Sequence, residues 1–158
     1  LSPYEGGINV PLIVHGPAVT TPGSESAALV NTTDLFATIA ELHGIDLATD
    51  MPSGIEHDSV SIVPYLTDPA TPSIRETVYA ELFLPNHSEE HIVEWRIIRN
   101  DRYKFIVFGS ENDPNRIEFY DLDVDPFETT NLLDDPLTQQ ESANFFRLVE
   151  SMRILLED

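Results

Sequence analysis

The sequence predicts a mixed α/β chain of the α+β kind, which ends in a small four-stranded antiparallel sheet and a C-terminal helix. Two observations support this. Four short segments between residues 77 and 122 are rich in β-branched and aromatic residues and are bounded by Asn, Asp, Gly or Pro. From residue 138 onward, apolar residues recur instead at helical spacing. Strands that follow one another directly favour antiparallel pairing, and the helix should bury its apolar face against the sheet.

The first part of the chain predicts a strand and two helical segments. Val10 to Val14 is a short apolar run between glycine-containing stretches, which suits a buried strand. From Thr33 to His43 apolar residues recur at helical spacing, with Thr32 or Thr33 as N-cap and Gly44 as the stop. A helical turn is expected around Ser61 to Leu66.

Two prolines, Pro69 and Pro72, mark a boundary, because the pattern changes from helical and irregular to strand-like after them. We therefore expect one domain over residues 1–70 and a second over residues 71–158.

The second part predicts the sheet. Its expected strands are Thr77 to Phe83, Val93 to Arg99, Tyr103 to Phe108 and Ile117 to Leu122. Asn100 and Asp101 separate the middle two, and a tight hairpin is expected there because both residues tolerate positive φ.

The C-terminal segment predicts one long amphipathic helix. Thr138 and Glu141 have the spacing of a capping box. One helical face carries the apolar residues Phe145, Leu148, Val149, Met152, Leu155 and Leu156.

Composition excludes several classes of function. The formal charge is −20, from 28 acidic and 8 basic residues, and Lys104 is the only lysine. Such a chain is unsuited to nucleic acid or to an anionic membrane surface. It contains no apolar run long enough to span a membrane. With no cysteine in the chain, disulfides, thiolate metal sites and cysteine nucleophiles are excluded.

Three alternating aspartates, Asp121, Asp123 and Asp125, resemble the start of a calcium loop. However, Pro126 stands where an EF-hand needs glycine, and Leu132 where it needs a bidentate glutamate. We therefore expect no metal here, but a turn whose side chains accept backbone hydrogen bonds.

Two histidines of an expected loop, His87 and His91, lie four residues apart with Glu89 and Glu90 between them. No helical pattern surrounds them, so a zinc site on a helix face is not indicated. A solvated loop is the first interpretation, and a place on the rim of a substrate pocket is the second.

No catalytic set emerges from the residues themselves: the sequence has no serine in a nucleophile elbow, no close His and Asp partnership and no Gly-rich phosphate cradle. The paired glycines Gly6 and Gly7 at least permit a close backbone approach. No residue is assigned a catalytic or metal-binding role.

Several segments do resemble a known family, the sulfatases. Tyr4-Glu5-Gly6-Gly7-Ile8-Asn9-Val10-Pro11 is similar to the family's Tyr-Glu-Gly-Gly-Ile-Arg-Val-Pro stretch. Further similar segments, in the family's order, are residues 31–44, Asp58 to Leu66, Trp95 to Arg99, Arg102 to Ile106, Phe119 to Leu122 and Asp125-Pro126-Phe127-Glu128. The chain departs from the family at Asn9, where Arg is usual, and at Ser59, where Gly is usual.

The resemblance implies a parent enzyme that hydrolyses sulfate esters with a formylglycine nucleophile and a calcium ion, both held by residues upstream of Tyr4. Residues 1–70 would then be the end of an alkaline-phosphatase-like α/β domain, and residues 71–158 its C-terminal subdomain. The expected partners are the missing N-terminal part of the same enzyme and a sulfate ester substrate. The chain alone should be inactive, and a sulfate-contacting lysine is expected immediately ahead of Leu1.

Within the chain, the resemblance places Tyr4 and Glu5 at the edge of the active site, and His87 and His91 on its rim. Two alternatives stay open. One is a phosphonate or phosphate ester hydrolase of the same superfamily, in which the Trp-Arg and Asp-Pro-x-Glu elements also occur. The other is a non-catalytic module that binds partners such as sugars.

Overall fold

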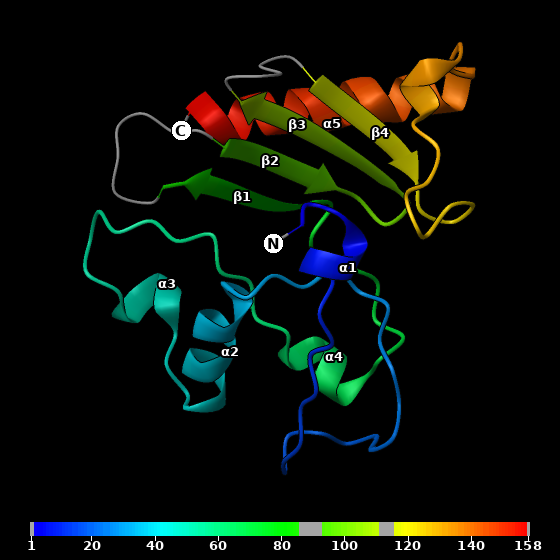
Figure 1. Ribbon diagram of the computed structural model, residues 1–158. Helices are drawn as coiled ribbons and strands as arrows, with labels where there is room; N and C mark the ends of the chain where they lie inside the picture. The colour runs from blue at the N-terminus through cyan, green and yellow to red at the C-terminus, as the bar shows by residue number, and fades with distance from the viewer. Residues whose placement is uncertain (1, 86–92, 111–115, 158) are drawn as a thin grey trace. The chain divides into compact units, whose positions relative to one another are not determined.

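The computed structural model describes residues 2–85, 93–110 and 116–157 (Figure 1). The chain divides into two compact units. Residues Leu1–Pro11 and Thr77–Asp158 form one, called here the sheet unit, and Leu12–Glu76 form the other, called the helical unit. No helix of the described residues is both long and apolar enough to cross a membrane.

The sheet unit contains the four-stranded antiparallel sheet that the sequence predicts. Its strands pair in chain order: β1 (Val78–Leu84), β2 (Val93–Arg99), β3 (Tyr103–Ser110) and β4 (Arg116–Asp121). The hairpin between β2 and β3 forms at the predicted place. The Asn100 N–H donates to the Tyr103 carbonyl at 3.0 Å, and the Asn100 side chain accepts the N–H of Tyr103 at 2.6 Å.

Helix α5 (Gln139–Glu157) covers one face of this sheet (Figure 1). Its capping box is formed, because the Glu141 N–H donates to Thr138 Oγ1 and the Thr138 N–H donates to Glu141 Oε2. Leu148 and Met152 are buried in a cluster with four residues of the sheet: Ile98, Tyr103, Phe105 and Phe119. The last residues of the predicted apolar face, Leu155 and Leu156, are exposed.

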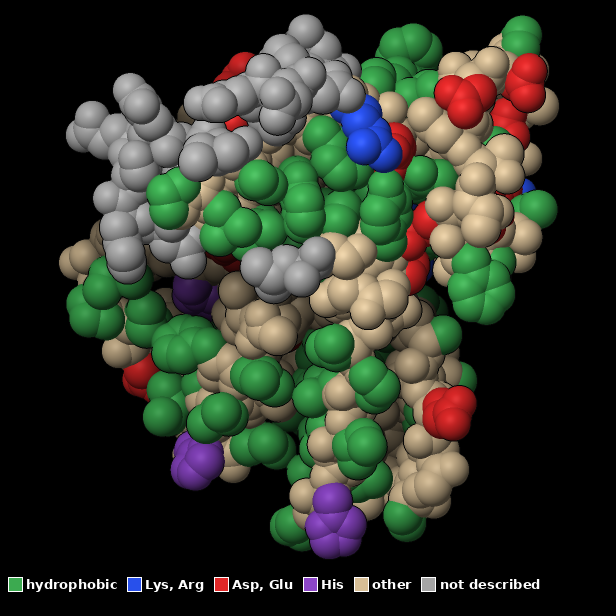
Figure 2. Space-filling model, viewed as in Figure 1, with side chains coloured by type: hydrophobic (Ala, Val, Ile, Leu, Met, Phe, Trp, Pro, Cys, Tyr) green, Lys and Arg blue, Asp and Glu red, His purple; other side chains and the backbone are tan. Residues whose placement is uncertain are grey.

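The opposite face of the sheet has its own apolar cluster. Because side chains alternate along a strand, Ile97 of β2 and Ile106 of β3 point away from α5 and pack with Phe108 and Tyr120. Figure 2 shows hydrophobic side chains gathered on this face of the sheet. Ile8 of the short helix α1 (Glu5–Ile8) and Tyr4, which precedes that helix, pack against the cluster.

The helical unit contains α2 (Asp34–Leu42), α3 (Leu47–Asp50) and α4 (Val63–Thr67). Helix α2 lies where predicted and is followed by Gly44 at φ 72°, a left-handed value that glycine adopts without strain. Thr33 occupies the N-cap, one of the two predicted positions, although its side chain makes no capping hydrogen bond. Small and polar residues of α2 are buried, whereas its large apolar residues Leu35, Phe36, Ile39 and Leu42 are exposed.

The predicted strand at Val10 to Val14 is not formed. This segment has no regular structure, and its apolar side chains are exposed, Ile13 to 89%. A strand needs a neighbour to pair its backbone. Among the described residues, no sheet takes up this segment.

Candidate functional site

The sulfatase-like N-terminal motif enters a buried network of charges in the sheet unit. Glu5 is the first residue of α1. Its Oε1 accepts a hydrogen bond from Lys104 Nζ at 3.1 Å, and its Oε2 pairs with Arg99 Nη1 at 2.7 Å. Asn9, which stands where the family has Arg, donates from Nδ2 to Glu5 Oε2 at 2.9 Å. The positive charge beside Glu5 thus comes from β2 and β3 rather than from position 9.

Lys104 is the centre of this network. It lies on the same face of β3 as Ile106, and its side chain is 0% exposed. A buried ammonium is costly unless opposite charges surround it. Glu128 supplies the second carboxylate, with Oε1 at 2.7 Å from Lys104 Nζ, while its Oε2 accepts the backbone N–H of Glu5.

Tyr4 belongs to an adjacent set of polar contacts on the same face. Its hydroxyl donates to Glu118 Oε2 at 3.0 Å, and the Tyr120 hydroxyl donates to the same oxygen at 2.8 Å. Arg116 pairs with the other Glu118 oxygen. Burial and then the nearby Glu118 carboxylate raise the pKa of both Tyr4 and Tyr120. Both hydroxyls therefore stay protonated at neutral pH and act as donors.

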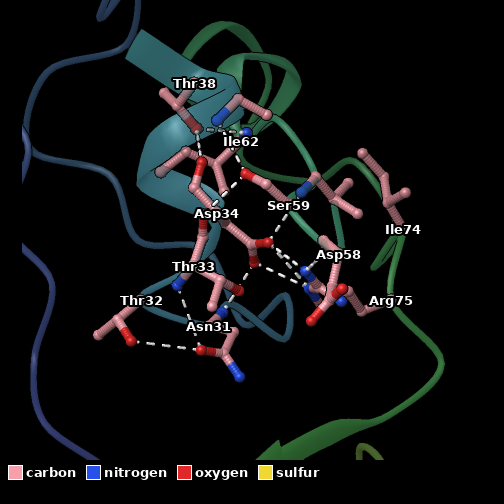
Figure 3. Close-up of polar contacts among 12 residues, drawn as sticks. Asn31, Thr32, Thr33, Asp34, Thr38, Asp58, Ser59, Ile62, Ile74 and Arg75 are labelled. Atoms are coloured by element: carbon pink, nitrogen blue, oxygen red, sulfur yellow. Dashed lines mark hydrogen bonds and ion pairs between the residues drawn. The ribbon is translucent and has the colours of Figure 1, made fainter. Parts of the chain in front are cut away.

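A second buried network lies in the helical unit, around Asp34 at the start of α2 (Figure 3). Its carboxylate is 1% exposed and accepts the N–H groups of Asn31 at 2.8 Å and Val60 at 2.9 Å. Arg75 donates to both carboxylate oxygens and also to the Asp58 carbonyl. Burial by itself would raise the pKa of Asp34, but these hydrogen bonds outweigh it, so that the pKa lies below its ordinary value.

The loop after α3 is tied to α2 by side-chain hydroxyls (Figure 3). Ser59 Oγ donates to the Thr33 carbonyl at 2.7 Å and accepts the N–H of Ala37 at 2.8 Å. Thr38 Oγ1 accepts the N–H of Ile62 at 3.0 Å. At the position where the family usually has glycine, the chain thus uses a serine side chain to fasten the loop.

The alternating aspartates form the predicted turn. Asp125 accepts the N–H groups of Thr129 and Thr130 at 2.7 and 2.8 Å, and Asp121 pairs with Arg102 at 2.5 Å. Within residues 2–85, 93–110 and 116–157, no group of three or more His, Asp or Glu side chains is placed to hold a metal ion.

The structure describes two of the four predicted site residues, the sequence neighbours Tyr4 and Glu5, whose side chains enter two adjacent sets of polar contacts. His87 and His91 lie outside the described residues. Sequence reasoning missed Lys104 and Glu128 as partners of Glu5. One signal in the sequence could have indicated a buried charge: Lys104, the only lysine, stands among apolar residues in a predicted strand.

The known proteins that this chain resembles are sulfatases. A family model described as N-sulphoglucosamine sulphohydrolase, C-terminal, matches residues 2–154. A sulfatase of Formosa agariphila is 34% identical over 145 residues, which cover 87% of this chain and 25% of that protein. An ulvan-active sulfatase of the same organism is 30% identical, and the match covers 82% of this chain and 30% of the relative.

Solved structures agree with this result. The structure of BT1596, a 2-O GAG sulfatase, is 28% identical with a TM-score of 0.59, and the match covers 90% of this chain and 27% of that one. The structure of BT4656 in complex with D-glucosamine-2-N,6-O-disulfate is 23% identical with a TM-score of 0.56, and it shows the fold alone. The chain spans 23% to 30% of the length of these four proteins.

Proposed function

Because the chain belongs to the N-sulphoglucosamine sulphohydrolase C-terminal family of sulfatases, we propose that it is the C-terminal part of an enzyme that hydrolyses sulfate esters. The observation that carries this proposal is the family match over residues 2–154. The contacts of Glu5 add support, since they join three sulfatase-like segments that lie far apart in the sequence.

The proposal divides the chain by role. Residues 1–70 are the end of the catalytic α/β domain, and residues 71–158 are the C-terminal subdomain. Tyr4 and Glu5 lie at the edge of the active site, and His87 and His91 on the rim of the substrate pocket. The partner of this chain is the preceding part of the same enzyme.

The chemistry itself belongs to that preceding part. The resemblance implies a formylglycine nucleophile and a calcium ion there, and the ion would stabilise negative charge on the sulfate oxygens. Because the described residues include no group suited to a metal, we assign none of them to calcium. What this chain supplies is a fixed scaffold, built around Lys104 and Glu128, for the segment that contains Tyr4 and Glu5.

The test compares the full-length protein with the isolated chain. We expect the full-length protein to hydrolyse an aryl sulfate, and the isolated chain to release no product above the buffer rate even with added calcium. Hydrolysis by the full-length protein of a phosphonate or phosphate ester, with none of any sulfate ester, would contradict the proposed reaction. Turnover by the isolated chain would contradict the division of roles.

A further inference from the structure

The N-terminal segment, residues 1–11, is part of the sheet unit although residues 12–76 separate it from the sheet in sequence. Over its described residues, 2–11, it forms one helix, α1, which has four residues. Isolated helices of this length are not stable in water. Contacts with the sheet unit must therefore hold α1 in place, and those of Arg99, Lys104 and Glu128 converge on Glu5.

The Glu5 contacts come from separate elements of the sheet unit. Arg99 ends β2, Lys104 lies at the start of β3, and Glu128 lies in the turn after β4. Glu128 adopts φ 55°, which is uncommon for a residue with a side chain. In this conformation its side chain reaches both Lys104 Nζ and the N–H of Glu5.

A buried set of charges can favour one geometry without adding net stability. Apolar residues of similar volume often give equal or greater stability than a buried ion pair. Removing one member, however, leaves the other charges without compensation. The Lys104, Glu5 and Glu128 set therefore penalises any displacement of α1 that breaks one of its contacts.

We propose that Lys104 is a positioning residue, which acts through Glu5 and Glu128 to fix residues 4–9 on the sheet and thereby aligns the active-site edge of the enzyme. The part that concerns catalysis rests on the proposed function. Because its side chain is 0% exposed, Lys104 is placed to act through its two carboxylate partners.

The experiment uses the full-length enzyme with Lys104→Met. The variant keeps a long side chain but removes the charge. We expect kcat for an aryl sulfate to fall by about 10- to 100-fold, the scale of a small misplacement of reacting groups, under conditions in which circular dichroism shows a folded protein. Amide hydrogen exchange of residues 4–9 should accelerate by at least about tenfold. The control, Arg153→Met, removes an exposed cation of α5 and should change neither quantity.

A purely stabilising role gives a different result. In that case the melting temperature falls, while kcat per folded molecule and the exchange of residues 4–9 stay at wild-type values, and the proposal is overturned. If Lys104→Met does not fold, Glu128→Gln replaces it, because it keeps the side-chain shape while removing one charge. The same increases in exchange and loss of kcat are expected.

The two proposals can fail separately. If the full-length protein hydrolyses no sulfate ester, the proposed function is wrong, and hydrogen exchange in the 158-residue chain still tests the positioning role. Unchanged exchange of residues 4–9 in Lys104→Met would reject that role whatever the activity.

Discussion

Asp34 and Lys104 are both almost completely buried, and each is stabilised by partners from elsewhere in its unit. Asp34 accepts two backbone N–H groups and the Arg75 guanidinium, whereas Lys104 lies between two carboxylates. In both cases the partners replace the hydration that burial removes. Loss of a partner should therefore cost more than loss of an exposed ion pair.

The first prediction concerns Arg75. In Arg75→Met the Asp34 carboxylate stays buried without its cation, so we expect the free energy of unfolding to fall by about 3 kcal/mol. Arg153→Met, which breaks exposed pairs with Glu150 and Glu157, should cost less than about 1 kcal/mol. Urea denaturation of the two variants measures the difference. Equal losses would mean that the Asp34 pair is no stronger than a surface pair.

The second prediction concerns pH. Hydrogen bonds hold the pKa of Asp34 below its ordinary value of 3.8. A depressed carboxyl pKa contributes stability that is fully present above the unfolded-state pKa and is lost as the pH falls through the folded-state pKa. Unfolding free energies should therefore decline below about pH 4, and Asp34→Asn should flatten part of that decline. Urea midpoints of both proteins between pH 7 and pH 2 provide the measurement; parallel curves would contradict it.

At the scale of elements, sequence reasoning succeeded where the determining signals are local. The hairpin at Asn100 and the capping box at Thr138 each depend on residues only a few positions apart. The Glu5 network could not be predicted in the same way, because its partners Lys104 and Glu128 are 99 and 123 residues away. The exposed apolar residues of α2 were likewise unpredictable, since periodicity identifies a helix but not which side chains the remaining structure covers.

The third prediction uses two leucines of α5. Leu148 is 0% exposed and Leu155 is 47% exposed. Leu148→Ala should lower the unfolding free energy by about 3 kcal/mol, because it removes buried apolar surface and leaves a cavity against the sheet. Leu155→Ala makes the same chemical change at a largely solvated position and should cost under about 1 kcal/mol. Thermal or urea unfolding compares them, and similar losses would argue against the packing of α5 described here.

At the scale of the whole molecule, acidic residues far outnumber basic ones, 28 against 8. At least seven of the eight basic residues form ion pairs with Asp or Glu. The basic side chains thus mostly pair with acidic groups of the chain itself. The remaining acidic residues give the chain its formal net charge of −20. An acidic excess of this size is repelled by a phosphate backbone.

The last prediction concerns the apolar run Val10 to Val14. Its sequence is that of a buried strand, yet in this chain its side chains are exposed and it joins no sheet. If the chain is the C-terminal part of a longer sulfatase, we expect a strand of the preceding part to pair with it and to cover Leu12 and Ile13. Amide hydrogens at Val10 to Val14 should then exchange at least about 100-fold more slowly in the full-length protein than in this chain. Residues Phe105 to Val107 of β3 serve as the internal control, because they are paired on both sides here and should be protected in both proteins. Fast exchange of Val10 to Val14 in the full-length protein would mean that the run is not a strand of the complete enzyme.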